Sequence, residues 1–167
     1  MAKRARKHYF TVAEANAKVS DVAAGFQQVL QIRALLKNLY ARLEAAGYPM
    51  QPAHLEGVED EAEAPAAVIA DRARFRGLAQ ALKEQIEMIL ATGCVIKDVE
   101  SGLVDFPALC EGREVWLCWR LGERGVDFWH EHDRGFADRR PVSELSPATA
   151  VCAPSTTEPP ATPATKP

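Results

Sequence analysis

The sequence of 167 residues contains no apolar run long enough to cross a membrane as a helix, because such a span needs about 20 predominantly apolar residues. Its N-terminus also lacks the apolar stretch that a secretory signal requires. These two absences argue against a membrane partner and predict a cytoplasmic protein.

Familiar catalytic and metal-binding motifs are missing as well. There is no glycine-rich phosphate loop, no GxSxG and no HExxH. The four cysteines (Cys94, Cys110, Cys118 and Cys152) form no CxxC pair and show no zinc-ligand spacing. Without a secretory signal the thiols should be reduced, and Cys94 and Cys118, which have apolar neighbours, should be small core residues.

Basic charge is also scarce, since the net charge is −3. Nucleic-acid-binding domains usually carry a basic surplus, so the composition argues against that role. The exception is the segment 1–8, which is basic and is predicted to be a flexible, solvated N-terminus. With 47% hydrophobic residues, the chain can nevertheless build an ordinary globular core.

Two long segments have helical periodicity. The first begins at a capping box formed by Thr11 and Glu14, and its apolar residues then recur in steps of three and four, as in a coiled coil. Gly47 and Pro49 should end this helix. A second striped segment runs from Val68 to a glycine cap at residue 93, after an acidic linker over 51–65. The matching stripes predict an antiparallel helical hairpin over 11–93.

From residue 94 the apolar period changes to two, which predicts strands. Four are expected, joined by short turns into an antiparallel sheet over 94–140: Val95–Val99, Leu103–Phe106, Glu114–Arg120 and Val126–His132. The predicted fold is therefore a single α+β domain over 9–141, with a long two-helix hairpin followed by a small four-stranded antiparallel sheet. The three tryptophans should fill the core between sheet and helices. The Pro/Ala/Thr-rich tail over 142–167 is predicted to be disordered.

The densest polar string is Trp129-His130-Glu131-His132-Asp133. On a strand, His130 and His132 would share a face, and two such histidines can bind one metal ion. A further ligand is required, and the candidates are Asp98, Glu100, Asp105, Asp127, Glu131 and Asp133. The alternative is that His130 is a buried histidine satisfied by a carboxylate or a carbonyl.

A second polar group surrounds one predicted turn. Asp98, Glu100 and Asp105 are candidates for acid–base work, although Asp and Ser beside Gly more often cap a turn. Asp105 is also a candidate to pair with Arg113 or Arg120 on the adjacent strand. Cys118 and His130 can be imagined as a nucleophile and its base across neighbouring strands, but nothing in the sequence indicates an activated thiol.

Four longer strings carry a family resemblance: Tyr9–Asn16, Lys97–Leu109, Gly112–Glu123 and Trp129–Arg139. Together they resemble the uncharacterised prokaryotic family called domain of unknown function 2203, over roughly residues 9–141. The resemblance implies no established activity. The shared pattern it implies comprises Asp98, Gly102, Asp105, Arg113, Trp119, Arg120, Glu123, His130, Glu131, Asp133, Gly135 and Phe136.

The resemblance also refines the candidate site. The family usually has an apolar residue at the position of His132, which makes that histidine incidental. The candidate metal ligands therefore become His130, Glu131, Asp133 and Asp105, with a divalent transition metal as the candidate cofactor. A second candidate polar cluster comprises Asp98, Glu100, Arg113, Arg120 and Glu123.

Three functional hypotheses follow, and the sequence leaves open whether the protein is an enzyme. In the first, the hairpin is an interaction or oligomerisation module, with a second copy of the chain as a candidate partner. In the second, the protein binds a metal near the Trp129–Asp133 string, either as a metal-binding protein or as a metal-dependent hydrolase or redox enzyme. The third and weakest is nucleic-acid association through Lys3–Lys7 and the tryptophans.

Overall fold

The computed structural model describes residues 8–57 and 64–145. The predicted N-terminal arm up to Lys7, most of the acidic run in the linker, and the tail from Ser146 onward lie outside these residues. The helices are α1 (Val12–Ala45), α2 (Pro52–Glu56) and α3 (Ala66–Ala91). The strands are β1 (Val95–Asp98), β2 (Leu103–Cys110), β3 (Arg113–Arg120), β4 (Phe128–Glu131) and β5 (Arg140–Pro141). Two 3-10 helices, Phe136–Asp138 and Val142–Glu144, flank β5.

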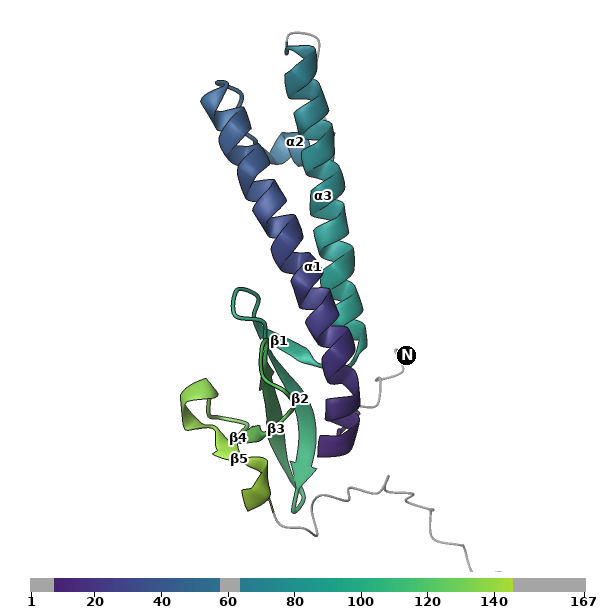
Figure 1. Cartoon of the computed structure of the whole chain (residues 1–167), viewed down its shortest axis with the longest axis vertical. Coiled ribbons are helices and arrows are strands. Elements are labelled where there is room, and N and C mark those ends of the chain that lie inside the picture. The colour runs from purple at the N-terminus through teal and green to yellow at the C-terminus, as the bar shows by residue number, and fades with distance from the viewer. Residues whose placement is uncertain (1–7, 58–63, 146–167) are drawn as a thin grey trace, which may run out of the picture.

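The helical hairpin forms as predicted. At the start of α1 the Thr11 hydroxyl accepts the backbone N–H of Glu14, and the Glu14 carboxylate accepts the backbone N–H of Thr11. Beyond its end, Gly47 has a φ of 82°, a left-handed conformation that glycine adopts without steric cost. Helix α3 then runs back along α1, and Figure 1 shows the two helices side by side.

Two details of the hairpin differ from expectation. The predicted apolar stripe of α1, counted in steps of three and four, includes Tyr40, but near its C-terminus α1 buries the preceding Leu39 and leaves Tyr40 exposed. The segment expected to be a plain linker contains the short helix α2, which buries His54. The imidazole of His54 accepts the backbone N–H of Gln51, which precedes the helix. Local capping therefore ordered a segment whose polar composition predicted a loop.

The sheet is an antiparallel meander in the order β1-β2-β3-β4-β5. The prediction of four strands was wrong by one, because β5 is too short to show a period of two. The prediction that β2 ends at Phe106 was also wrong, since the strand continues through Pro107 to Cys110. The Pro107 carbonyl accepts the N–H of Phe10, so this residue's backbone faces away from β3. Its missing N–H therefore costs the β2–β3 ladder nothing.

The two faces of the sheet have different neighbours. The face toward α1 and α3 supplies the main hydrophobic core, together with Phe26, Val29 and Ile89 of the helices. Its strand residues are Val104, Phe106, Ala108, Cys110, Val115, Leu117, Trp119 and Trp129. Trp116 lies on the opposite face, so the prediction that all three tryptophans fill this core holds for only two of them.

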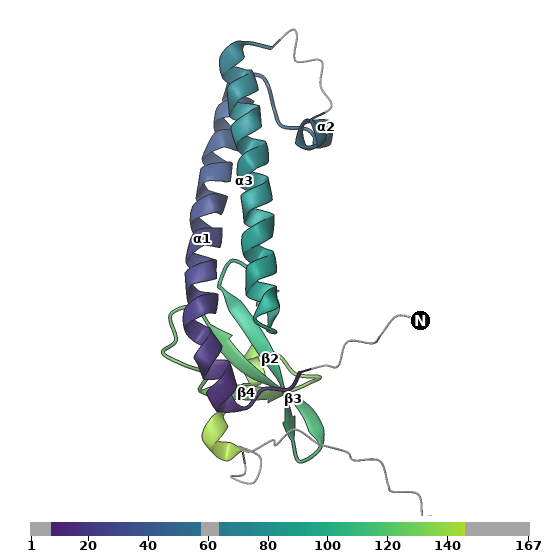
Figure 2. The ribbon, with the colours of Figure 1, turned by 90° about the vertical axis from the view of Figure 1, so that its right-hand side faces the viewer.

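The sheet packs beside the first half of α1, and the hairpin projects well beyond it (Figure 2). Two contacts fix this arrangement outside the core. The Asn16 side chain on α1 accepts the N–H of Val126, just before β4, at 2.9 Å. Arg33 pairs with Glu100 in the β1–β2 turn, also at 2.9 Å. Among the described residues, no helix is long and apolar enough to cross a membrane.

Two helical glycines offer a test of the α1–α3 packing. A Cβ at Gly25 would lie 2.7 Å from Cγ1 of the buried Ile89, whereas a Cβ at Gly77 would meet nothing within 4 Å. We expect Gly77→Ala to raise the free energy of unfolding by about 0.5–1 kcal/mol, through helix propensity alone. Gly25→Ala should instead lower it by about 1–3 kcal/mol, because the added Cβ would overpack the contact with Ile89. Urea denaturation of both variants measures the difference, and equal gains at the two sites would contradict the packing.

Candidate metal centre

A buried polar cluster lies on the sheet face opposite the helices. It consists of Asp105 on β2, Cys118 on β3 and His130 on β4, whose possible ligand atoms all lie within 4.8 Å of one another. The strand register explains the meeting. Asp105 on β2 is directly opposite Cys118 on β3. His130 on β4 is opposite Trp116, which lies two residues before Cys118 and on the same face of β3. Because the Cys118 side chain on the middle strand is short, the longer side chains from the two flanking strands can meet above it.

The hydrogen bonds of His130 fix the orientation of its ring. Nδ1 lies 2.8 Å from the backbone carbonyl of Glu131. A carbonyl can only accept, so Nδ1 must carry a proton. The other nitrogen, Nε2, lies 3.1 Å from Oδ2 of Asp105. A neutral imidazole held this way would point a lone pair at a carboxylate, so this contact requires a proton or a metal ion between the two atoms.

The Asp105 carboxylate is almost completely buried but only half satisfied. Its Oδ2 contacts His130 and lies 3.5 Å from Nζ of Lys97. Its Oδ1 is buried and has no hydrogen-bond partner among the described residues. A buried acceptor without a partner costs about 1–3 kcal/mol, and such orphaned atoms are rare in folded proteins. This oxygen therefore has the free coordination capacity that a metal ligand needs.

The Cys118 thiol is held in its neutral form by its surroundings. Burial, and then the nearby Asp105 carboxylate, raise the pKa of Cys118 from 9.0 to about 12, although the neighbouring Arg139 opposes the shift. Nη1 of Arg139 lies 3.9 Å from the sulfur and 2.9 Å from a carboxylate oxygen of Glu123. The guanidinium of Arg139 also stacks on Phe136, 3.6 Å from the ring centroid.

These features favour metal binding over covalent catalysis. A nucleophilic cysteine needs a lowered thiol pKa and exposure to substrate, and Cys118 has neither. A bound metal ion, in contrast, displaces the thiol proton and binds the thiolate directly. Thiolate, imidazole and carboxylate are the three side-chain groups that bind zinc in proteins.

The structure brings together only part of the predicted ligand set. His130 and Asp105 meet, as the hypothesis required, but the neighbours of His130 do not join them. Glu131 lies on the other side of the strand and pairs with Arg113 at 3.2 Å. Asp133 follows the end of β4 and is exposed, and His132 stacks on Trp116 at the surface.

The second predicted cluster does not form one site. Asp98 caps the β1–β2 turn, and the hydrogen bonds that its carboxylate accepts, first from the Ser101 hydroxyl and then from the backbone N–H groups of Ser101 and Glu100, lower the pKa of Asp98. Glu100 pairs with Arg33, and Arg113 with Glu131. Arg120 and Arg139 both face the ring of Phe136, and Glu123 pairs with Arg139. The predicted pairing of Asp105 with Arg113 or Arg120 is wrong, because its ionic partners are Lys97 and His130.

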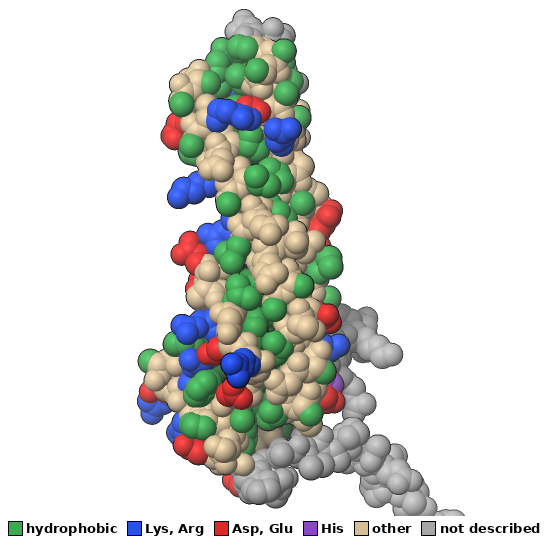
Figure 3. Space-filling model, viewed as in Figure 1, with side chains coloured by type: hydrophobic (Ala, Val, Ile, Leu, Met, Phe, Trp, Pro, Cys, Tyr) green, Lys and Arg blue, Asp and Glu red, His purple; other side chains and the backbone are tan. Residues whose placement is uncertain are grey.

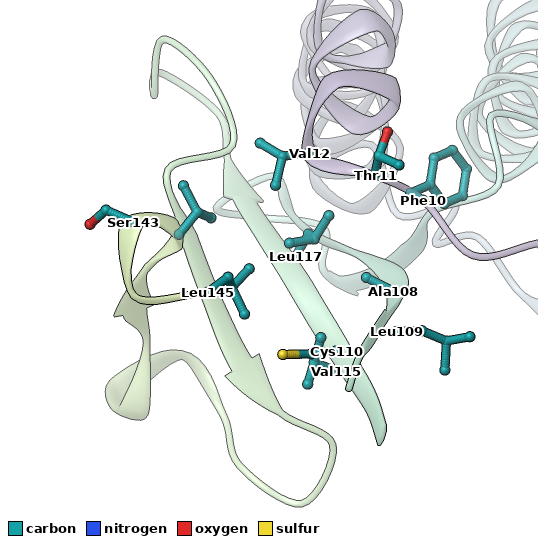
Figure 4. A pocket seen from close by; sticks show the side chains of 11 residues that line it. Phe10, Thr11, Val12, Ala108, Leu109, Cys110, Val115, Leu117, Ser143 and Leu145 are labelled. Carbon is teal, nitrogen blue, oxygen red and sulfur yellow. The ribbon is translucent and has the colours of Figure 1, made fainter. Parts of the chain in front are cut away.

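A separate apolar pocket of about 290 Å³ lies on the helix-facing side of the sheet (Figure 4). Phe10, Ala108, Val115, Leu117 and Leu145 are among the side chains that line it, with the hydroxyls of Thr11 and Ser143. None of its lining residues is charged, and it includes no member of the metal cluster. We therefore assign it no part in the chemistry of that centre.

Sequence reasoning missed Cys118 as a candidate ligand. Its apolar neighbours favoured a core role, and no second cysteine stood at a familiar spacing. The available signal was indirect: alternation puts Asp105, Cys118 and His130 on the same side of three predicted strands. Only the register between those strands shows that the three meet.

The comparisons with known proteins give a family but no activity. A family model described as an uncharacterized conserved protein (DUF2203) matches residues 8–142. No curated protein and no solved structure matches the chain.

Because the pKa of Cys118 is raised, we expect the folded protein to lose stability at alkaline pH. The folded state holds the thiol proton more tightly than the unfolded state, so this stabilisation is complete below about pH 9 and is lost as the pH rises toward 12. We expect the free energy of unfolding to fall in this range, with a share from Cys118 of up to about 1.4 kcal/mol per pH unit.

Denaturation of the metal-free protein at several pH values measures this slope. Cys118→Ala should flatten it. Cys110→Ala, which also removes a buried sulfur but leaves Cys118 in place, should not. Equal slopes in the wild type and Cys118→Ala would contradict the assignment.

Proposed function

The chain belongs to this uncharacterized conserved family, and we propose that it is a metal-binding protein that holds one divalent transition-metal ion between Asp105, Cys118 and His130. The observation that carries the proposal is the unpartnered Oδ1 of Asp105, which is buried beside a thiol and an imidazole that can both serve as ligands.

Charge balance supports a divalent ion. When the ion binds, Cys118 becomes a thiolate and Asp105 is a carboxylate, while His130 binds through Nε2 as a neutral imidazole. The two negative ligands then cancel the two positive charges of the ion, and the buried cluster is neutral. Burying uncompensated charge is costly, so a neutral cluster suits a site as closed as this one.

The contacts around His130 fit the same role. Metal-binding histidines commonly donate their second ring N–H to a backbone carbonyl or a carboxylate, which fixes the ring and directs the other nitrogen to the ion. The Nδ1–H of His130 and the Glu131 carbonyl have this relationship. With one sulfur, one nitrogen and one oxygen ligand, zinc is the ion that the donor set suits best. A reducing cytoplasm, the predicted location, would keep Cys118 available as a ligand.

Metal content after purification without chelator tests the proposal. We expect about one zinc ion per chain by plasma mass spectrometry, and a loss of at least tenfold in His130→Ala. His132→Ala is the matched control, because that histidine is two positions away on the surface and should leave the metal content unchanged. Retention of the metal in His130→Ala, or its absence from correctly folded wild type refolded with zinc, would contradict the proposal.

Cobalt substitution tests the ligand set separately. Co²⁺ bound to Cys118 should give a sulfur-to-metal charge-transfer band in the near ultraviolet. Cys118→Ser should abolish this band, and Asp105→Asn should weaken cobalt binding. Glu131→Gln should change neither, because Glu131 pairs with Arg113 on the other side of β4. A band that survives in Cys118→Ser would assign the thiolate to another cysteine.

The projecting hairpin favours a second candidate function, self-association. Between α1 and α3 lies a hollow of about 380 Å³, lined by Leu35, Leu39 and Leu78 and by the cationic Arg42 and Arg74. Figure 3 shows hydrophobic side chains along the length of the hairpin, interspersed with charged ones. A second copy of the hairpin packed on this face would bury apolar surface that the small sheet does not reach.

Leu35 and Leu55 allow a matched test, since both side chains are 51% exposed. Leu35 lines the hollow on α1, whereas Leu55 lies on α2 and does not line it. We expect light scattering to show a dimer for the wild type and Leu55→Glu, and a monomer for Leu35→Glu. A wild type that stays monomeric at high concentration would exclude self-association.

A further inference from the structure

We infer that Lys97 is a built-in competitor of the metal: its ammonium neutralises Asp105 when no ion is bound, and the ion must displace it to bind. The inference rests on the proposed metal site and adds how occupancy of that site is controlled. Its starting point is the 3.5 Å contact between Nζ of Lys97 and Oδ2 of Asp105, the oxygen that also faces His130.

The alternation of side chains along β1 places Lys97 on the outer face of the sheet, because Val95 is opposite Asp105 and Ile96, opposite Val104, faces the helix-side core. The register of β1 shifts between Ile96 and Asp98, as in a β-bulge. Such bulges often lie beside functional sites. Here the side chain extends over the outer face of the sheet, with its ammonium 4.6 Å from the ring centroid of Trp116.

Without an ion, the Lys97 ammonium shares the compensation of the Asp105 carboxylate with His130. A buried carboxylate is costly unless cations or hydrogen bonds compensate it. Lys97 is the lysine that the structure pairs with Asp105, and its side chain is partly exposed while that of Asp105 is almost fully buried. The ammonium can therefore stay partly hydrated while it stabilises the carboxylate, as long side chains do when they reach in from the surface.

When the ion is bound, the cluster does not need the positive charge of Lys97. The divalent ion, the Cys118 thiolate and the Asp105 carboxylate together carry no net charge. A Lys97 ammonium left at 3.5 Å from the same oxygen would add an unbalanced positive charge and repel the ion. Because its side chain is partly exposed already, Lys97 can swing toward water without unfolding the strand.

Because Lys97 and the ion cannot both occupy the position beside Asp105, they compete for it, and this competition makes the ion exchangeable. Part of the binding free energy is used to move Lys97 away, so affinity is lower than the three ligands alone would give. Release of the ion is also eased, since the lysine returns to the carboxylate and no uncompensated buried charge remains. A site of this kind suits reversible loading better than a permanent structural ion.

Lys97→Met tests the competition, because methionine keeps much of the apolar stem and removes the charge. We expect zinc affinity, measured by competition with a chromogenic chelator, to rise at least about tenfold. Lys97→Arg, which retains a cation, should stay within about threefold of the wild type. Lys83→Met on α3 is the matched control: it also removes one exposed ammonium, which pairs there with Glu87 on the same helix, and should leave affinity unchanged.

A measurement on the unmodified protein covers the case in which Lys97→Met does not fold. Zinc should release Lys97 into water, so its rate of acylation by a succinimidyl ester should rise severalfold relative to that of Lys83, as followed by peptide mass spectrometry. Wild type that binds zinc with no change in Lys97 acylation, or Lys97→Met with wild-type affinity, would overturn the competition while leaving the metal site intact. Failure of the wild type and every folded variant to bind zinc would instead overturn the site itself, and the competition with it.

Discussion

The burial of one carboxylate, that of Asp105, constrains the whole outer face of the sheet. An isolated buried charge is so unfavourable that its neighbours must compensate it. The chain does this from three directions: His130 reaches it from β4, Lys97 from β1 and the Cys118 thiol from β3. Each of these groups is placed by strand pairing, so the meander topology and the polar cluster depend on each other. Loss of the carboxylate would remove the ionic partner that Lys97 and His130 share.

The two faces of the sheet have different roles: the helix-facing side forms the hydrophobic core, and the outer side carries the polar cluster. The helix-facing side is almost entirely apolar and holds the sheet to α1 and α3. The other side faces away from α1 and α3, and cationic side chains and the 3-10 helix Phe136–Asp138 lie over it. Arg139 links this segment to the sheet through Glu123 and lies beside Cys118. The strand core therefore provides rigidity, while the partly exposed side chains above the cluster can move.

Sequence reasoning reached the architecture because the signals for it are local. The capping box at Thr11, the helical stripes and the change of period after residue 93 each concern neighbours along the chain. Two outcomes depended instead on long-range contacts. Pro107 was expected to follow the end of a strand, but its backbone faces Phe10 rather than β3. Cys118 is buried, as expected of a small core residue, but its meeting with Asp105 and His130 follows only from the register of three strands.

A buried ion pair between Asp105 and an imidazolium at His130 is the main alternative to a metal site, and the two differ in what they leave unexplained. The ion pair accounts for the 3.1 Å contact, for Lys97 and for the Cys118 thiol beside the carboxylate, but it leaves Oδ1 of Asp105 without a hydrogen-bond partner among the described residues. A divalent ion uses the same two residues, engages the thiol and leaves a neutral cluster. In the proposed site, Lys97 is the group that holds the carboxylate when the ion departs, so one arrangement of strands would serve both states.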